Sequence, residues 1–294
     1  MKKSIIFSGI GCALITPFSD GAIDFPTLKE LINIQIECGT DAIIIGGTTG
    51  ECATLSDDER YRLFSFSRAE VGGRCKLIFG TGTNDTRAAM RHTMLASRIG
   101  CDGVLAVTPY YNKGTESGIV KHYLQIAEAS TVPVLLYNVP SRTGVNLTVK
   151  TLSELALHEN IVGIKEASDS LDRYIKLASL GDVLHLYAGS DSQIFTTLAL
   201  GGKGVISVMA NLYPRQTRDI YKRYIAGDRE GSLALQGRAL PLINSLFAET
   251  NPAPIKYAMS RLGLCSGELR LPLAEVSEST KEYIVHEMTA FEMT

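Results

Sequence analysis

The stretch from residue 134 to residue 165, VLLYNVPSRTGVNLTVKTLSELALHENIVGIK, contains the repeating unit that decides the fold. It begins with the apolar run Val134–Tyr137 and closes on a second run, Ile161–Ile164. Both runs are continuously apolar, whereas a strand with one solvated face would alternate apolar and polar residues. We therefore interpret them as parallel strands that are buried on both faces and joined by a crossover segment.

Six further runs of this kind extend the pattern along the chain. In order, the eight predicted strands are Gly9–Thr16, Ala42–Ile45, Leu77–Phe79, Gly103–Val107, Val134–Tyr137, Ile161–Ile164, Leu184–Tyr187 and Gly204–Val208. Their spacing of about 25–30 residues is typical of strand–helix units, and eight such units favour closure into a barrel. We predict an α/β fold, a (β/α)8 TIM barrel. The alternative, an open doubly wound sheet, would be expected to carry a glycine-rich nucleotide loop that this chain lacks in that context.

Amphipathic stretches lie between the predicted strands, and Ser56 and Glu59 form a capping-box pattern before one of them. The helices predicted from these stretches include Thr27–Glu37, Asp57–Ala69, Thr86–Ser97 and Ser117–Ala129. After about residue 227 the strand runs stop, and three helical stretches follow, Glu230–Phe247, Pro254–Leu262 and Val276–Met288. We therefore expect a catalytic barrel over residues 1–227 and a C-terminal helical appendage over residues 228–294.

Composition excludes several classes of function. A net charge of −2 over 294 residues gives no basic surface for nucleic acid or anionic lipid. The first residues are interrupted by serine and glycine, which does not fit a signal peptide, and no apolar run approaches the length of about 20 residues that spans a membrane. The six cysteines are scattered and the five histidines lack metal-ligand spacing. We expect a cytoplasmic protein without a metal site or another cofactor.

Polar residues at the carboxyl ends of the predicted strands are the candidates for chemistry, because that edge forms the active face of a barrel. Lys165 follows the sixth run, where burial disfavours the ammonium and favours an amine that can attack a carbonyl. Tyr137 ends the fifth run and could transfer a proton. Taken singly, a salt bridge between Lys165 and Glu166, or a core tyrosine with a satisfied hydroxyl, explains each residue as well.

Three loops add polar groups at the same edge. The loop Gly46–Glu51 combines glycines with the hydroxyls of Thr48 and Thr49, which suits a small carboxylate, although a tight turn explains it equally well. Arg142 lies on a loop shaped by proline and glycine and could bind a carboxylate with both nitrogens, or it could simply be solvated. The paired tyrosines of the loop at residues 108–112 could serve only packing or a subunit contact.

Assembled in this way, the chain resembles the dihydrodipicolinate synthase (4-hydroxy-tetrahydrodipicolinate synthase) family, within the N-acetylneuraminate lyase superfamily of class I aldolase-like barrels. The resemblance covers nearly the whole chain. The superfamily is marked by Gly47-Thr-Thr-Gly-Glu51, Tyr137 and Gly163-Ile-Lys-Glu166. The synthases are marked by Tyr110-Tyr-Asn112 and by Asn138-Val-Pro-Ser-Arg-Thr-Gly144, whose Arg142 distinguishes them from the sugar-acid lyases.

The resemblance implies a lyase that condenses pyruvate with L-aspartate 4-semialdehyde in lysine and diaminopimelate biosynthesis. It implies an imine between pyruvate and Lys165, and a proton relay through Thr48, Tyr137 and Tyr111. It further implies a homotetramer, a dimer of dimers, in which Tyr111 comes from the neighbouring subunit. Its substrate-binding residues would be Thr49 for the pyruvate carboxylate, Arg142 for the carboxylate of the semialdehyde, and the backbone carbonyls of Gly189 and Ile206.

The chain departs from the family pattern at two places. Lys113 stands where family members commonly have proline. The chain also keeps Asn84 and Tyr110 of the lysine feedback site of the inhibited enzymes, but three positions of that site differ, Asp57, Arg60 and Ala88. Ala88 replaces an acid that pairs with the ammonium of the inhibitor, and removal of such a partner weakens binding strongly. We therefore predict weak or absent inhibition by lysine.

Two other functions are compatible with parts of this pattern. The first is a pyruvate-dependent aldolase for 2-keto-3-deoxy sugar acids or N-acetylneuraminate, against which Arg142 argues. The second is a barrel that senses a small keto acid without turnover, against which the combination of Lys165, Tyr137 and Thr48 argues.

Overall fold

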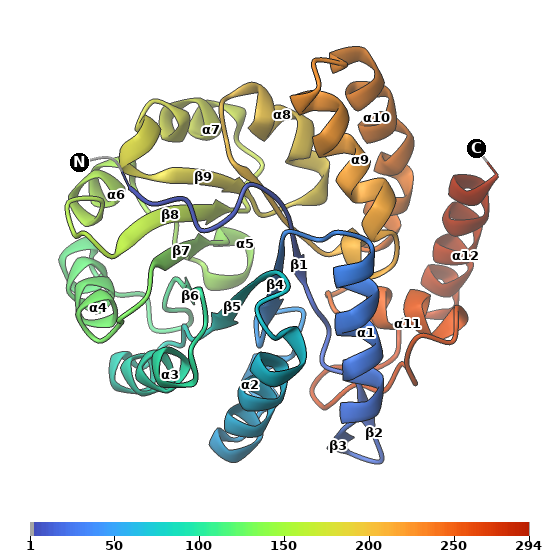
Figure 1. Cartoon of the computed structure of the whole chain (residues 1–294), viewed down its shortest axis with the longest axis horizontal. Helices are drawn as coiled ribbons and strands as arrows, with labels where there is room; N and C mark the ends of the chain where they lie inside the picture. Colours follow the sequence, from blue (N-terminus) through green and yellow to red (C-terminus); the bar gives the residue numbers. More distant parts are fainter. Residues whose placement is uncertain (1–2, 294) are drawn as a thin grey trace.

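A computed structural model describes residues 3–293 and contains a closed barrel of eight parallel strands (Figure 1). Around the barrel the strand order is β1-β10-β9-β8-β7-β6-β5-β4, so each strand pairs with its neighbours in sequence and β10 closes on β1. The predicted TIM barrel is therefore confirmed. The strands are β1 (Gly9–Ala13), β4 (Ala42–Ile45), β5 (Lys76–Gly80), β6 (Gly103–Val107), β7 (Val134–Asn138), β8 (Ile161–Glu166), β9 (His185–Ala188) and β10 (Gly204–Ser207).

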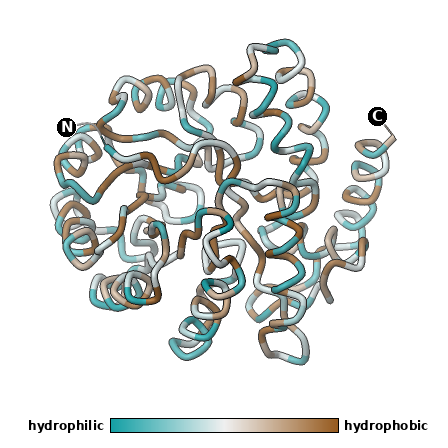
Figure 2. Tube along the Cα trace, in the orientation of Figure 1, coloured by the Kyte–Doolittle hydropathy of each residue, from teal (hydrophilic) through white to brown (hydrophobic). Residues whose placement is uncertain are grey.

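The strands have apolar side chains on both faces because each face packs into a different core. In β4, Ile43 and Ile45 point outward into the layer between barrel and helices, whereas Ala42 and Ile44 point into the barrel interior. All four are at most 1% exposed. In the tube of Figure 2 the central strands are mostly brown, while the surrounding helices alternate between brown and teal. This difference separates strands with two buried faces from helices with one.

Helices surround the barrel and begin and end at the signals that the sequence contains. Ser56 and Glu59 form both hydrogen bonds of the predicted capping box at the start of α2. Asp85 caps α3, and Gly100 ends it in the left-handed conformation that glycine adopts without strain. The helices of this layer are α1 (Phe25–Glu37), α2 (Asp57–Val71), α3 (Thr86–Ile99), α4 (Glu116–Glu128), α6 (Val149–Leu155), α7 (Leu171–Ala178), α8 (Ile194–Ala199) and α9 (Pro214–Ile225).

The C-terminal part of the described chain is helical and lies against one side of the barrel (Figure 1). It consists of α10 (Arg229–Ser245), which packs on α9, followed by α11 (Ala253–Arg261) and α12 (Glu278–Glu292). The segment between α11 and α12 contacts a two-stranded hairpin after β1, formed by β2 (Phe18–Ser19) and β3 (Ala22–Ile23). Ser266 Oγ donates a hydrogen bond to the Phe18 carbonyl, and Arg270 donates to the Gly21 carbonyl. Sequences far apart in the chain therefore meet beside the barrel.

In the part of the chain that the structure describes, no helix combines the length and apolar character needed to cross a bilayer.

Candidate active site

Lys165 and Tyr137 lie next to each other near the carboxyl ends of adjacent strands. Their Cα atoms are register partners between β8 and β7, so their side chains project from the same face of the sheet. Tyr137 belongs to the core inside the barrel, and Lys165 Nζ lies 4.3 Å from the centroid of its ring. Both side chains are buried, Lys165 to 5% exposure. The geometry therefore places a primary amine and a phenol together at the mouth of the barrel.

Glu166 is not the partner of Lys165, so the salt-bridge interpretation of that lysine is wrong. Successive residues of a strand point to opposite faces, and Glu166 accordingly points away from the barrel interior. Its carboxylate accepts a 2.8 Å hydrogen bond from Arg173 Nε and another of 2.8 Å from Asn138 Nδ2. The hydrogen bonds of Glu166 therefore lie on the outer side of β8, and the amine of Lys165 points into the mouth of the barrel.

A cavity of about 330 Å³ opens over Lys165. Its size is near the lower end of the range for small-molecule sites. Loops that follow several different strands supply its walls, as expected for the active face of a barrel. The lining residues include Lys165, Tyr137, Thr48, Thr49, Arg142 and Gly189. Six of the eight residues predicted for the site thus share one cavity.

The loop Gly46–Glu51 is a series of tight turns that directs its threonines toward this cavity. Gly46 has a φ of +67°, which glycine adopts without strain, and a Cβ atom there would lie 2.9 Å from the Phe64 ring. Both the backbone conformation and the available space therefore require glycine. The backbone amide of Gly50 donates to the Gly47 carbonyl at 3.1 Å, and that of Glu51 to the Thr48 carbonyl at 3.1 Å. Such turns fix the loop that carries Thr48 and Thr49.

Asn251 is a cavity residue that the sequence interpretation missed. Its Nδ2 donates a 3.0 Å hydrogen bond to Thr49 Oγ1, and its backbone carbonyl accepts one of 3.0 Å from Arg142 Nη2. Its own Oδ1 is buried and lacks a hydrogen-bond partner in the described protein. Asn251 precedes α11 and is far from any strand end in the sequence. The expectation that site residues follow the carboxyl ends of strands therefore does not include it. It orients two predicted substrate-binding groups at once.

Asp191 is a second residue that the sequence interpretation missed. It follows β9, is 1% exposed, and accepts backbone hydrogen bonds from Val208 at 2.9 Å and Met209 at 3.0 Å. Burial raises the pKa of its carboxyl, against the opposing effects of its hydrogen-bond donors and the positive charge of Lys165. Asp191 therefore ties the loop after β9 to the loop after β10, both of which line the cavity.

The other two predicted site residues lie outside the cavity wall. Ile206 is fully buried in β10, two residues before Val208, which does line the cavity. Tyr111 is 83% exposed on the loop after β6 and has a φ of +71°, a left-handed conformation that is unusual for tyrosine. Tyr111 is not among the residues of its own chain that line the cavity over Lys165.

A second cavity, of about 300 Å³, adjoins the first through Thr48, Arg142 and Asn251. Tyr110 lines it, and the acid among its lining residues is Glu51, which is already paired with Lys256. Near it, Arg60 is buried and donates a 2.9 Å hydrogen bond to the Cys52 carbonyl. The residues that line this cavity therefore offer no unpaired carboxylate to the ammonium of a bound lysine. Weak or absent inhibition by lysine stays our prediction.

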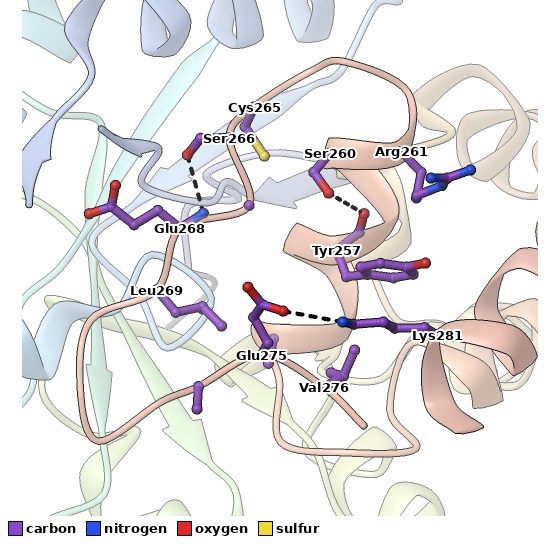
Figure 3. Close-up of a pocket in the computed structure, with 13 residues that line it drawn as sticks. Tyr257, Ser260, Arg261, Cys265, Ser266, Glu268, Leu269, Glu275, Val276 and Lys281 are labelled. Atoms are coloured by element: carbon purple, nitrogen blue, oxygen red, sulfur yellow. Dashed lines mark hydrogen bonds and ion pairs between the residues drawn. The ribbon is translucent and has the colours of Figure 1, made fainter. Parts of the chain in front are cut away.

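A third cavity, of about 750 Å³, lies elsewhere, between α11, α12 and the segment that joins them (Figure 3). Two of its charged groups, Lys281 and Glu275, pair with each other at 3.1 Å. None of the residues predicted for catalysis lines it. Within residues 3–293, no group of three or more His, Cys, Asp and Glu side chains is arranged to hold a metal ion.

Comparison with known proteins adds a family to this geometry. The model of the dihydrodipicolinate synthetase family matches residues 6–291. The chain is 46% identical to a 4-hydroxy-tetrahydrodipicolinate synthase of Clostridium novyi over 98% of both chains, and 45% identical to one of Clostridium tetani over 97% of both. The dihydrodipicolinate synthase structure of Thermotoga maritima superposes with a TM-score of 0.95 at 38% identity, covering 99% of this chain and 100% of that one.

Proposed function

The chain belongs to the dihydrodipicolinate synthetase family, and we propose that it condenses pyruvate with L-aspartate 4-semialdehyde through an imine on Lys165. It is a lyase of the class I aldolase-like kind, and its product, 4-hydroxy-tetrahydrodipicolinate, lies on the diaminopimelate route to lysine. The observation that carries the proposal for Lys165 is its buried amine beside Tyr137 on the floor of a small cavity. An amine shielded from water is the nucleophile that carbonyl chemistry requires.

In the proposed reaction the Lys165 amine attacks the keto carbon of pyruvate, and loss of water gives the imine. Proton loss from the pyruvate methyl group gives an enamine, whose carbon adds to the aldehyde. The amino group of the semialdehyde then attacks the imine carbon, closes the ring and releases Lys165. In the proposed relay Tyr137, whose ring lies beside the amine, moves protons at the first and last steps, and Thr48 and Tyr111 complete the relay.

The two carboxylates of the substrates have separate proposed binding groups. Thr49 is 3% exposed and would hold the pyruvate carboxylate. The backbone carbonyl of Gly189, in the cavity wall, would border the same site, and we propose the same for that of Ile206, two residues before Val208 of the wall. Arg142 lies at the rim, where its guanidinium can bind the carboxylate of the semialdehyde with two nitrogens. We further propose residues 1–227 as the catalytic barrel and residues 228–294 as the helical region that braces it.

We also propose a cytoplasmic homotetramer, a dimer of dimers, in which each subunit completes the site of its partner. Tyr111 supports this proposal, because an aromatic side chain that is 83% exposed in a strained conformation is readily explained by a partner surface. All six cysteines are free thiols, as is usual in a reducing compartment.

The alternative within the same chemistry is an aldolase for sugar acids or N-acetylneuraminate. A coupled assay that offers pyruvate with L-aspartate 4-semialdehyde, or with aldehydes derived from sugars, separates the two. We expect turnover with the semialdehyde alone, and we expect Arg142→Lys to lower kcat/KM for it by about 10–100-fold, since a single ammonium replaces a bidentate fork. Faster turnover of a sugar aldehyde would overturn the proposed substrate.

A further inference from the structure

We propose that the buried ion pair between Glu51 and Lys256 positions the loop of Thr48 and Thr49, so that the C-terminal helical region sets the affinity for pyruvate. The inference rests on the proposed function and deepens it. It assigns a role to two residues that lie outside the 330 Å³ cavity and form no part of the proposed relay.

The pair is fully enclosed. Lys256 Nζ lies 2.5 Å from Glu51 Oε1, and the two side chains are 1% and 0% exposed. The ammonium also donates a 2.7 Å hydrogen bond to the Glu268 carbonyl and lies 4.2 Å from the centroid of the Phe18 ring. The other carboxylate oxygen, Glu51 Oε2, accepts a 3.1 Å hydrogen bond from the backbone amide of Arg270. Both charges therefore have several partners.

Stability alone is a poor explanation for such a pair. Burial lowers the pKa of Lys256, and the neighbouring Glu51 opposes that shift. Removing two charges from water costs free energy that their attraction often fails to recover, so apolar residues of similar volume stabilise a core as well or better. What an ion pair adds is a fixed relative position, because both partners must meet in one geometry.

The ion pair fixes the position of the loop Gly46–Glu51. Glu51 closes the turn in which its own amide donates to the Thr48 carbonyl, and its φ of +52° is left-handed. Glycine or asparagine would adopt this backbone at lower cost, so the position requires the glutamate side chain in spite of the strain. Any displacement of Glu51 passes directly to Thr48.

The C-terminal region contacts the loop at a second point nearby. Asn251, two residues before α11, donates to Thr49 Oγ1, while Lys256 within α11 holds Glu51. Glu268 and Arg270, which complete the surroundings of the pair, belong to the segment that borders the 750 Å³ cavity, where Figure 3 labels Glu268. The residue before this helix, the helix itself and the segment after it thus hold both the middle and the end of the loop.

The test measures the pyruvate concentration that gives half-maximal labelling of Lys165 by borohydride, together with Tm, in the full-length protein. The variants are Glu51→Gln, the double variant Glu51→Gln/Lys256→Met, and Ile284→Ala, which removes buried apolar volume from α12 without touching the loop. We expect both Glu51 variants to raise the half-maximal concentration about tenfold, because a small misplacement of binding groups is costly. The double variant should recover Tm, since it leaves no unpaired buried charge.

Ile284→Ala should lower Tm and leave the half-maximal concentration within about twofold of the parent. The inference is overturned if the concentration follows Tm across all variants, or if the double variant binds pyruvate as the parent does. If Glu51→Gln does not fold, the pyruvate concentration that gives half-maximal labelling of the double variant decides the test. Absence of labelling in the parent would overturn the proposed function instead, so the two failures are distinguishable.

Discussion

At the scale of single residues, the proposed chemistry depends on one amine and one phenol that adjacent strands bring together. Lys165 Nζ lies over the ring of Tyr137 at 4.3 Å, and neither side chain faces bulk solvent. Asn251 holds Thr49 and Arg142 near this pair through hydrogen bonds, and Asp191 holds the loop after β10 in the same way. Reactive and positioning groups are thus supplied by different parts of the chain.

Replacing Tyr137 by phenylalanine tests the role of the phenol. We expect Tyr137→Phe to lower kcat by about 10²–10⁴-fold, the usual contribution of a general acid or base, with little change in the KM for pyruvate. Steady-state kinetics with both substrates would show this. An unchanged kcat would remove Tyr137 from the proposed relay.

The sequence predicted the two residues of the proposed chemistry that the structure brings together, but not the residues that hold the groups around them. Lys165 and Tyr137 were predictable because they end apolar runs, and parallel strands bring their carboxyl ends together. Asn251 was assigned only to a break between helices, because its function arises from a contact with Thr49 across most of the chain. The Glu51–Lys256 pair is of the same kind, since no local pattern marks two charges that meet only in the folded protein.

At the scale of elements, Glu59 links the start of α2 to the C-terminal segment. It completes the capping box with Ser56, and its carboxylate pairs with the guanidinium of Arg270. The hydrogen bond from Arg270 is the main cause that lowers the pKa of Glu59 from its ordinary 4.5 to about 2. The local pattern predicted the cap, but the tertiary partner was not visible in the sequence.

The lowered pKa of Glu59 predicts a pH dependence of stability. A carboxyl whose pKa is lower in the folded state stabilises that state above its unfolded pKa, and the contribution is lost as the pH falls through about 4.5 to 2. We expect Glu59→Gln to cost about 1–2 kcal/mol in the free energy of unfolding at neutral pH, allowing for solvent screening, and roughly half as much at pH 3.

Urea unfolding at the two pH values measures this difference. Asp58→Asn is the matched control, because Asp58 is 76% exposed and its pair with Arg62 lies on the surface of the same helix. The control should change stability little at either pH. A cost of Glu59→Gln that does not vary with pH would contradict the assignment.

The strands and helices themselves were largely predictable. Ala42–Ile45 and Gly103–Val107 have the predicted bounds, because a strand buried on both faces leaves an uninterrupted apolar run. The first run was predicted to Thr16, but β1 ends at Ala13. Leu14 makes one last backbone hydrogen bond to Ile44 of β4, and the amide of Ile15 then donates to the Asn211 side chain instead of a strand. The hairpin β2–β3 was missed, since two strands of two residues leave no periodic signal.

At the scale of the whole molecule, an exposed Tyr111 predicts that active sites are shared between subunits. Lys165→Met and Tyr111→Phe should each be nearly inactive alone. Hybrid dimers of the two, co-expressed with different tags, should regain up to about half of the parental activity, because one of the two sites is then intact. Hybrids as inactive as both parents would place Tyr111 outside the partner's site.

The predicted response to lysine also belongs to the scale of the whole molecule. We expect millimolar lysine to leave the initial rate nearly unchanged, because Ala88 supplies no acid and Glu51 is already paired with Lys256. Initial rates at a fixed pyruvate concentration over a series of lysine concentrations test this. Inhibition in the micromolar range would contradict it.

The central claim is that Lys165 forms the bond to pyruvate, and reductive trapping tests it most directly. The protein is incubated with pyruvate and sodium borohydride, digested, and its peptides are analysed by mass spectrometry. We predict a reduced pyruvate adduct on the peptide that contains Lys165, dependent on pyruvate and lost in Lys165→Met. An active protein that yields no adduct, or carries it on another lysine, would contradict the account.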